Sequence, residues 1–224
     1  MPEPIRILST KKLLPNQKQF LLNANFAVIE ANFIETKSKE FEIGNYIQNL
    51  IFTSQNAFKS FLENEKSQTL KDKKIFCVGI KTQQLIEQNG FQVMASKEYA
   101  SELAEVIVND FGNETFTFFS GNLRRETLPE ALKKANISYE EIEVYETILT
   151  PQKINSPVNG ILFFSPSGVQ SYLQVNKITD ENCFCIGTTT AEALKEITEN
   201  SIIAKQQTVE NVIIQCINYY TKLH

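Results

Sequence analysis

The stretch Leu50-Ile-Phe-Thr-Ser-Gln-Asn-Ala-Phe-Lys-Ser-Phe-Leu62 occurs twice in this chain of 224 residues. It returns in altered form as Ile161-Leu-Phe-Phe-Ser-Pro-Ser-Gly-Val-Gln-Ser-Tyr-Leu173, with Ser54 and Ser165 in register 111 residues apart. Two further matches have the same spacing: Ser9 with Ser120, and Glu35-Thr36 with Glu146-Thr147. A repeat of about half the chain length predicts two similar domains rather than a solenoid of short units. We expect the functional site in a cleft between such domains.

The composition restricts the class of protein. The formal net charge is −4 and the sequence pI is about 5.3, whereas a nucleic-acid-binding domain normally carries a basic stripe. The sequence has neither an 18-residue apolar run nor a basic N-terminus followed by an apolar stretch. The four cysteines, at positions 77, 183, 185 and 216, predict packed and reduced thiols. We therefore expect a cytoplasmic protein that binds neither nucleic acid nor membranes.

The shortage of histidine narrows the chemistry further. The only histidine is His224, at the C-terminal position, and there is no tryptophan. A Ser-His-Asp or Cys-His catalytic unit cannot be built inside such a chain, and a histidine-rich metal site is excluded. Any reaction must use hydroxyls, backbone amides, carboxylates and a few cations.

The hydrophobic pattern predicts an α/β fold with parallel sheets, because short apolar runs alternate with helical stretches. Ser101 is the expected N-cap of one helix, and Gly90 is the expected residue just after the end of another. Strands are predicted at 5–8, 27–35, 50–53, 74–78, 91–95, 116–119, 141–147, 161–164, 183–186 and 202–204. Helices are predicted at 15–23, 57–64, 82–89, 101–109, 128–135, 169–175, 190–199 and 210–220.

The lengths of the connections suggest how the blocks group into domains. The connection 108–116 is short, whereas 36–49 and 150–159 are long and polar, as expected for crossings between domains. This favours one domain from both chain ends, residues 1–33 plus 152–224, and one from the middle, residues 40–143. Residues 34–39 and 144–151 would then form the connection and hinge. A tandem pair of domains is the alternative.

Four hydroxyl-rich turns follow predicted strands and precede helices. They are Thr53-Ser54-Gln55-Asn56, Ser120-Gly121-Asn122, Ser165-Pro166-Ser167-Gly168 and Thr188-Thr189-Thr190. In an open α/β sheet the carboxyl ends of the strands form the ligand-binding edge, where helix N-terminal amides can bind anionic oxygens. The alternative is that these residues are ordinary N-caps.

Two further features are candidates for function. Arg124-Arg125 are expected to open a helix, where cations are unfavourable against the helix dipole, so they are candidates for binding an anionic substrate. The alternative is a surface pair bridged to Glu126 or Glu130. Tyr145 has Ile34 as its counterpart in the repeat and could supply a phenol as a hydrogen-bond donor or weak acid. Its alternative is strand packing.

Five stretches, in the order of the chain, resemble the uroporphyrinogen-III synthase family: Leu50-Ile-Phe-Thr-Ser-Gln-Asn-Ala57, Gly121-Asn-Leu-Arg-Arg-Glu-Thr-Leu-Pro129, Val144-Tyr-Glu-Thr147, Phe163-Phe-Ser-Pro-Ser-Gly168 and Ile186-Gly-Thr-Thr-Thr-Ala191. The resemblance implies two similar flavodoxin-like α/β domains, joined by a two-stranded antiparallel β-ladder. It also implies a lyase of heme biosynthesis that cyclises hydroxymethylbilane to uroporphyrinogen III, with loss of water and inversion of ring D. No cofactor or metal is implied, and we expect a monomer.

The resemblance also implies roles for individual residues. Tyr145 matches the family's tyrosine, proposed to assist loss of the hydroxyl. The implied substrate-binding residues are Thr53, Ser54, Thr82, Gly121, Asn122, Arg124, Arg125, Ser165, Ser167, Gly168, Thr189 and Thr190. Two departures are Thr188, where the family often has proline, and Lys11, where many bacterial members have arginine. The rival interpretation is a non-catalytic two-domain protein that binds a small polyanion.

Overall fold

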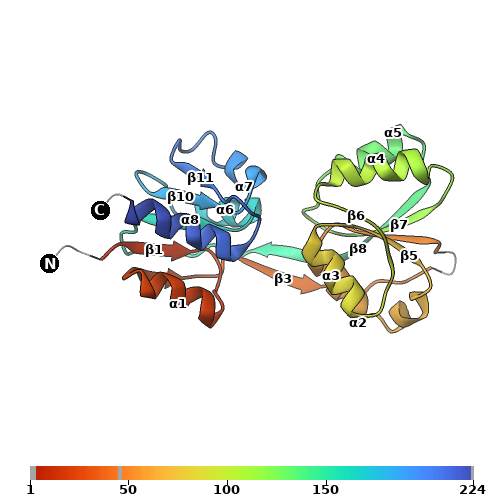
Figure 1. Ribbon diagram of the computed structural model, residues 1–224, viewed down its shortest axis with the longest axis horizontal. Coiled ribbons are helices and arrows are strands. Elements are labelled where there is room, and N and C mark those ends of the chain that lie inside the picture. The colour runs from red at the N-terminus through yellow and green to blue at the C-terminus, as the bar shows by residue number, and fades with distance from the viewer. Residues whose placement is uncertain (1–3, 45–46, 223–224) are drawn as a thin grey trace. The chain divides into compact units, whose positions relative to one another are not determined.

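The computed structural model describes residues 4–44 and 47–222. The chain divides into two compact units: unit 1 contains residues up to 35 and from 148 onward, and unit 2 contains residues 36–147 (Figure 1). Within the described ranges, no helix combines the length and apolar character needed to cross a lipid bilayer. Each unit is a parallel sheet covered by helices, so the predicted α/β class is confirmed.

The sheet of unit 1 has five strands in the order β11-β10-β9-β1-β2, and every adjacent pair is parallel. The strands are β1 (Arg6–Ser9), β2 (Ala27–Glu30), β9 (Gly160–Phe163), β10 (Asn182–Cys185) and β11 (Ser201–Ile203). The central strands β1, β9 and β10 are almost wholly buried, as expected for a parallel sheet covered on both faces.

Helices cover both faces of this sheet. On one face Leu162 packs with α1 (Pro15–Asn23) and α8 (Val209–Thr221). Its neighbours Ile161 and Phe163 point to the other face, where they pack with α6 (Pro166–Leu173), and α7 (Thr188–Glu192) lies beside α6. This alternation follows from the two-residue period of side chains along a strand.

The sheet of unit 2 has the order β3-β8-β7-β4-β5-β6, and the strands from β8 to β6 are parallel. The strands are β3 (Ile34–Ser38), β4 (Asn49–Phe52), β5 (Lys74–Val78), β6 (Val93–Lys97), β7 (Phe116–Gly121) and β8 (Tyr139–Leu149). The order β8-β7-β4-β5-β6 matches β2-β1-β9-β10-β11 of unit 1, although the chain enters it at a different strand. The internal repeat of the sequence therefore corresponds to the same order of five strands in the two sheets.

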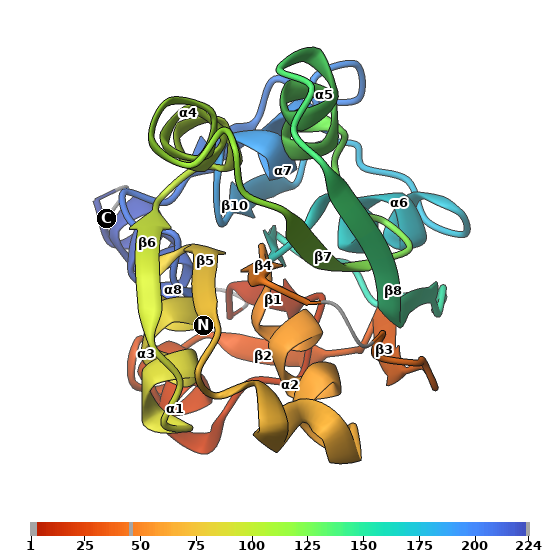
Figure 2. The ribbon, with the colours of Figure 1, turned by 90° about the vertical axis from the view of Figure 1, so that its right-hand side faces the viewer.

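Helices also cover both faces of the unit 2 sheet (Figure 2). The helices α2 (Gln55–Glu63) and α3 (Ile80–Gln88) pack on one face together with the 3₁₀ helix η1 (Glu65–Leu70). The helices α4 (Ala100–Asp110) and α5 (Thr127–Lys134) pack on the opposite face. The turns at the carboxyl ends of the strands lie at one edge of the sheet, between these two helix layers.

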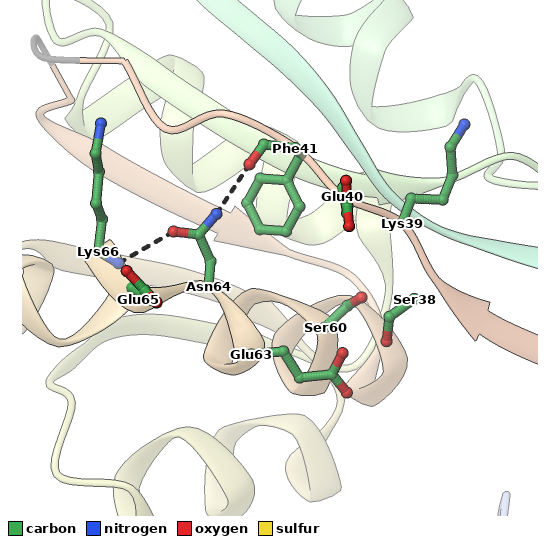
Figure 3. Close-up of a pocket in the computed structure, with 9 residues that line it drawn as sticks. All are labelled: Ser38, Lys39, Glu40, Phe41, Ser60, Glu63, Asn64, Glu65 and Lys66. Atoms are coloured by element: carbon green, nitrogen blue, oxygen red, sulfur yellow. Dashed lines mark hydrogen bonds between the residues drawn. The ribbon is translucent and has the colours of Figure 1, made fainter.

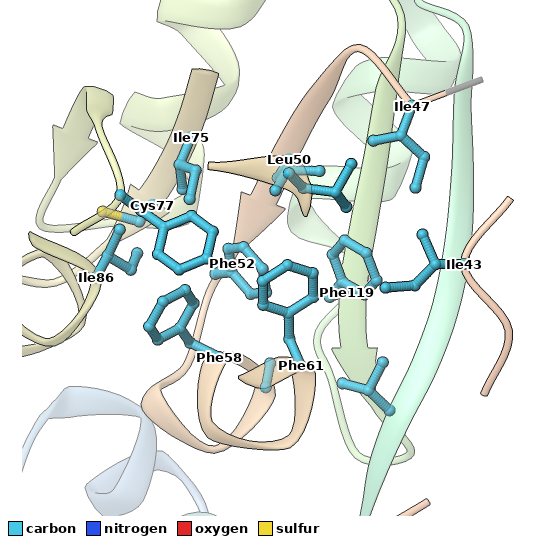
Figure 4. Close-up of a cluster of buried hydrophobic side chains, with 14 residues drawn as sticks. Ile43, Ile47, Leu50, Phe52, Phe58, Phe61, Ile75, Cys77, Ile86 and Phe119 are labelled. Atoms are coloured by element: carbon cyan, nitrogen blue, oxygen red, sulfur yellow. The ribbon is translucent and has the colours of Figure 1, made fainter. Parts of the chain in front are cut away.

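A cluster of phenylalanines fixes the start of two of these turns (Figure 4). The rings of Phe52 and Phe119 stack with their centroids 5.2 Å apart, and Phe61 of α2 packs against both. All three side chains are fully buried, and burial of a phenylalanine contributes roughly 1.5–3 kcal/mol. Because Phe52 directly precedes Thr53-Ser54 and Phe119 directly precedes Ser120-Gly121, the core anchors both turns.

Three local predictions were wrong. Ser101 lies inside α4: Tyr99 is the N-cap residue, and its backbone N–H is bonded by the Glu102 carboxylate at 3.4 Å. The helix predicted at 190–199 ends at Glu192, because the following residues form successive turns closed by bonds such as Ile197 N–H to Leu194 C=O at 2.8 Å. Arg124 and Arg125 lie before α5, which begins at Thr127. Gly90 is confirmed after the helix end, with a φ of +79°.

Candidate active site

The candidate active site of unit 2 lies where the strand order reverses direction. From β7 the chain continues to β8 on one side, and from β4 it continues to β5 on the other. The turns after β7 and β4 therefore diverge at the carboxyl edge of the sheet, which is the usual ligand position in open α/β sheets. The predicted residues Gly121 and Ser54 lie in this place.

Ser54 is the N-cap of α2 and also contacts the phenol. Its backbone is extended, and its Oγ accepts the Ala57 N–H at 3.1 Å, which completes one of the free amides at the helix start. The same hydroxyl donates its proton to Tyr145 Oη at 3.1 Å. The phenol oxygen is thus an acceptor in this pair, so its own O–H is left to donate elsewhere.

Gly121 makes room for the ring of Tyr145. The two residues are partners in the β7–β8 ladder, after an irregularity in register between Ser120 and Gly121. A Cβ atom at position 121 would lie only 2.3 Å from Tyr145 Cζ. Because β7 lies between β8 and β4, the ring crosses β7 at the one residue without a side chain and so reaches Ser54.

Asn122 fixes the backbone beside Tyr145. Its side-chain Oδ1 accepts the Thr147 N–H at 2.8 Å, and its Nδ2 donates to the Thr147 carbonyl at 3.3 Å. Its own N–H donates to the Tyr145 carbonyl at 3.3 Å. These bonds tie the β7 turn to β8 at the tyrosine and two residues beyond it.

Arg124 is held by carboxylates. Its Nε donates to Glu141 Oε1 at 2.6 Å and its Nη2 to Glu141 Oε2 at 2.9 Å, while Nη1 pairs with Glu126. Ser120 Oγ donates to the same Glu141 Oε1 at 2.7 Å. Burial acts to raise the pKa of Glu141, but the hydrogen bonds from Arg124 and Ser120 outweigh it, so the pKa is lowered overall.

A hollow of about 420 Å³ opens at this edge of unit 2. It is lined by Gly121, Asn122, Arg124, Glu126, Glu141 and Glu143. Thr53, half-buried, precedes Ser54, and Thr82 is buried in the first turn of α3, where its N–H donates to the Gly79 carbonyl at 3.0 Å. Arg125 is exposed at the same edge, next to Arg124.

A second hollow of unit 2, of about 470 Å³, is less suited to chemistry (Figure 3). Its wall includes Asn64, whose Nδ2 donates to the Phe41 carbonyl at 2.9 Å and whose Oδ1 accepts the Lys66 N–H at 3.1 Å. Ser60 Oγ donates to the Val144 carbonyl. The Asn64 side chain holds the loop before β4 near the end of α2, and Ser60 holds α2 against β8, so both stabilise the fold.

The equivalent turn of unit 1 contains Ser165, Ser167 and Gly168. Ser165 is the N-cap of α6 and accepts the Gly168 N–H at 3.0 Å, and its hydroxyl lies 3.0 Å from that of Ser167. A Cβ at Gly168 would lie 3.3 Å from Ser165 Oγ and 3.8 Å from Thr10 Oγ1. The turn after β9 therefore lies beside the turn after β1, at the point where strand order reverses in unit 1.

Two other predicted positions of unit 1 follow β10, and Lys11, a departure from the family pattern, follows β1. Thr189 and Thr190 lie in the first turn of the short helix α7, and Thr190 is buried. The Lys11 ammonium lies 5.7 Å from the centre of the Phe164 ring.

Sequence reasoning missed Glu141, which accepts hydrogen bonds from both Arg124 and Ser120. Glu126 had been considered, because it is close in sequence, and the structure confirms that pair. Glu141 is 17 residues away on β8 and reaches Arg124 only through the pairing of β8 with β7. The register of the two strands would have been the signal, and it cannot be read from hydrophobic pattern alone.

The fold and the site define a class of protein: two α/β units of the same sheet order, each with hydroxyl-capped turns where strand order reverses, and a tyrosine held at one of them. Among the described residues, no group of three or more His, Cys, Asp or Glu side chains is placed to hold a metal ion.

Comparison with known proteins identifies the family. The model of the family described as Uroporphyrinogen-III synthase HemD matches residues 18–214. The uroporphyrinogen-III synthase of Chlorobaculum parvum is 24% identical over 170 residues, which cover 66% of this chain and 69% of that protein. The chain therefore belongs to the uroporphyrinogen-III synthase family.

Solved structures share the fold. The uroporphyrinogen-III synthetase of Helicobacter pylori matches with a TM-score of 0.74 at 19% identity, over 96% of this chain and 99% of that chain. A mutant uroporphyrinogen III synthase from the extremely thermophilic bacterium Thermus thermophilus matches with a TM-score of 0.70 at 12% identity, over 98% of this chain and 100% of that chain. At such identities the likeness concerns the fold.

Proposed function

We propose that the protein is a uroporphyrinogen-III synthase that cyclises hydroxymethylbilane with loss of water and inversion of ring D. The observation that carries the proposal is the unit 2 constellation in which Ser54 donates to Tyr145 across Gly121. In this arrangement the Tyr145 O–H is left as a proton donor at the carboxyl edge of the sheet. The chain's only histidine is His224, at the C-terminal position, so a phenol takes the place of the usual imidazole acid. The reaction needs one proton donor, because the departing hydroxyl must leave as water.

Tyr145 is the proposed acid. Its O–H protonates the terminal hydroxyl, the carbon–oxygen bond breaks, and water leaves behind a cationic azafulvene on the ring that carried the hydroxymethyl group. Ring D, at the other end of the bilane, then attacks this azafulvene. The phenolate formed in this step accepts the Ser54 proton in a hydrogen bond and lies near the N-terminus of α2, whose dipole favours negative charge. When the terminal ring has closed, the cyclised tetrapyrrole loses a proton, which restores the phenol.

The substrate's carboxylates are proposed to bind the hydroxyl-rich turns. Backbone N–H groups and hydroxyls at helix starts suit carboxylate oxygens, and preorganised donors of this kind stabilise charge that develops during a reaction. The proposed substrate-binding residues are Thr53, Ser54, Thr82, Gly121, Asn122, Arg124 and Arg125 of unit 2, and Ser165, Ser167, Gly168, Thr189 and Thr190 of unit 1. For Arg124 the pairs with Glu141 and Glu126 mean that it serves first as a support of the turn.

We propose that each unit is flavodoxin-like and that β3 and β8 form an antiparallel ladder. Their hydrogen bonds support this: Lys39 N–H donates to the Val144 carbonyl, and Thr150 N–H donates to the Phe33 carbonyl, so rising numbers on one strand meet falling numbers on the other. Residues 34–39 and 144–151 would then connect domains 1–33 plus 152–224 and 40–143.

A monomer in the cytoplasm is also proposed. All four cysteines are free and buried, and burial raises the pKa of the Cys183 and Cys185 thiols to about 12, so they are inert in a reducing compartment. Sedimentation of the purified protein tests the oligomeric state.

The function itself is tested by incubating the purified protein with hydroxymethylbilane and separating the product isomers by chromatography. The proposal predicts uroporphyrinogen III as the main product, whereas the non-enzymatic reaction closes to the uninverted isomer. Formation of the uninverted isomer alone, at the uncatalysed rate, would instead indicate a binding protein for polyanions.

A further inference from the structure

Three exposed apolar side chains stand at the carboxyl edge of the unit 2 sheet. Leu123 follows β7, Ile80 follows β5 and Tyr99 follows β6, each two residues beyond the end of its strand. Their side chains are 52%, 63% and 45% exposed. In the sheet order β7-β4-β5-β6, the Ser54 turn after β4 lies between Leu123 and the other two. We call Leu123, Ile80 and Tyr99 the apolar rim.

Leu123 points outward because its neighbours are held back. The turn is closed by the Arg124 N–H, which donates to the Gly121 carbonyl at 3.1 Å. The side chains of Asn122 and Arg124 are bonded to Thr147 and Glu141 on β8. Leu123 is thus an exposed apolar side chain at the turn's tip, although nothing in the turn requires an apolar residue there.

The fold does not require apolar residues at the other two positions either. Gly79, with φ of +87°, donates its N–H to the Lys97 carbonyl at 2.8 Å and so ties the β5 turn to the end of β6. Ile80 is then the first residue of α3, and Tyr99 is the N-cap of α4. N-caps are normally Ser, Thr, Asp or Asn, and the tyrosine side chain makes no cap bond. Exposed apolar residues gathered beside a site commonly mark a binding surface.

Cations stand next to the apolar rim. Lys81 adjoins Ile80, and Lys97 is two residues before Tyr99; both are exposed. Within the described part of the chain, neither lysine side chain takes part in an ion pair. Apolar surface interleaved with cations suits a ligand that has flat apolar rings and carboxylates at their edges, which the hydroxyl-rich turns alone would bind only at its carboxylates.

We propose that the apolar rim binds the faces of the substrate's pyrrole rings, while Lys81 and Lys97 attract its carboxylates. This inference rests on the proposed function and names residues that decide how the tetrapyrrole is seated beside Tyr145. Apolar contact is largely insensitive to salt, whereas attraction between exposed charges is screened by it. The two contributions can therefore be separated by ionic strength.

The experiment compares Leu123→Ser, Ile80→Ser and Tyr99→Ser with the wild type, using KM and kcat for hydroxymethylbilane at low and high salt. We expect each rim variant to raise KM about three- to tenfold, with kcat within about twofold and the salt dependence unchanged. Lys81→Gln combined with Lys97→Gln should raise KM at low salt only. Ile214→Ser is the matched control, because Ile214 is 45% exposed on α8 of unit 1, and it should leave KM unchanged.

Tyr99→Ser separates binding from folding. Serine is a better N-cap than tyrosine, so this variant should raise the melting temperature by about 2–4 °C while it raises KM. A residue with only a structural role could not move the two quantities in these directions. A drop in stability that accompanies the change in KM would contradict the inference.

A direct titration with uroporphyrinogen III, under anaerobic conditions, makes the test independent of turnover. If the wild type forms uroporphyrinogen III, but the rim variants have the wild-type KM for hydroxymethylbilane and the wild-type Kd for uroporphyrinogen III, the proposed role of the apolar rim is overturned. The proposed function then stands. If the wild type neither converts the bilane nor binds uroporphyrinogen III, both fall. Equal losses in Ile214→Ser and the rim variants would also overturn the inference.

Discussion

The Ser54 turn of unit 2 and the Ser165 turn of unit 1 have the same cap geometry and differ in the side chain that contacts the serine hydroxyl. Both serines are extended N-caps that accept a backbone N–H three residues on, at 3.1 and 3.0 Å. Ser54 gives its proton to Tyr145, whereas Ser165 lies against Ser167. The duplicated frame supplies the cap in both units, and only unit 2 adds a phenol.

The reason lies in two substitutions at the repeat spacing. Tyr145 has Ile34 as its counterpart 111 residues earlier, and Gly121 has Thr10. Thr10 is buried, and its hydroxyl donates to the Leu162 carbonyl at 2.7 Å, so it fills the space that Gly121 leaves for a ring. A tyrosine and the glycine beneath it therefore form one functional unit, which a shared fold does not by itself provide.

The largest effect is expected from Gly121→Ala. A methyl group would lie 2.3 Å from the Tyr145 ring and must displace it from Ser54. We expect kcat to fall about 100-fold or more, the range usual for loss of an acid catalyst. Gly44→Ala is the control, because no atom lies within 4 Å of the added carbon. Steady-state kinetics together with thermal melting check this; a Gly121→Ala enzyme that keeps its kcat would show that the ring position is irrelevant.

Arg124→Ala should have the next largest effect, on stability. It removes two hydrogen bonds to Glu141 and leaves that partly buried carboxylate with Ser120 alone. We expect a loss of about 2 kcal/mol in the free energy of unfolding, measured with urea.

In unit 1 the corresponding test is Lys18→Ala, which removes one bond to Glu30. A loss of about 1 kcal/mol or less is expected there, since the lysine is 40% exposed. Equal losses of stability in the two variants would mean that the two-bond contact of Arg124 with Glu141 stabilises the fold no more than the single bond of Lys18 with Glu30.

Ser54→Ala and Ser165→Ala sharpen the comparison between the two turns. Each variant loses an N-cap, so both should lose about 1 kcal/mol of stability. Ser54→Ala should also lower kcat about tenfold, because Tyr145 loses its donor, whereas Ser165→Ala should raise KM and leave kcat near the wild-type value. The same kinetic change in both variants would argue against distinct roles for the two turns.

The smallest effect concerns acid stability. The pKa values of Glu141 and Glu30 are lowered in the folded protein: burial opposes this, and hydrogen bonds from Arg124 and Lys18 outweigh it. A lowered pKa contributes stability at neutral pH, which is lost as the pH falls below about 4.5 and through the folded-state value. In Glu141→Gln and in Glu30→Gln, the free energy of unfolding lost between neutral and acid pH should in each case be smaller than in the wild type by roughly 1 kcal/mol or less. If a variant loses free energy of unfolding with falling pH as steeply as the wild type does, the corresponding pairing is contradicted.

Much of the fold could be predicted because local signals and tertiary structure agree. The apolar run at 74–78 and the helix at 15–23 were predicted with the bounds that the structure has. For the turn serines, ligand binding was the interpretation and an ordinary N-cap the alternative, and Ser54 and Ser165 are caps. Their role as ligands stays a prediction.

What escaped prediction depends on the registers between strands. The passage of Tyr145 across Gly121 requires the irregularity between Ser120 and Gly121, and the contact of Arg124 with Glu141 requires the pairing of β7 with β8. A one-residue shift would turn each of these side chains to the other face of the sheet, and no local pattern fixes the register of parallel strands joined through a helix. The start of α4 at Ala100 instead of Ser101 is a smaller and local failure: Tyr99 takes the N-cap position, and its backbone N–H donates to the Glu102 carboxylate.

The central claim is that the Tyr145 phenol gives up the proton that releases water from the bilane. The most direct measurement is the single-turnover rate of Tyr145→Phe with hydroxymethylbilane, compared with that of the wild type. Both proteins must have the same melting temperature, so that a lower rate reflects loss of the phenol and not of the fold. The account predicts a fall of about 100-fold, with the remaining product shifted to the uninverted isomer. A phenylalanine variant that forms uroporphyrinogen III at the wild-type rate would contradict it.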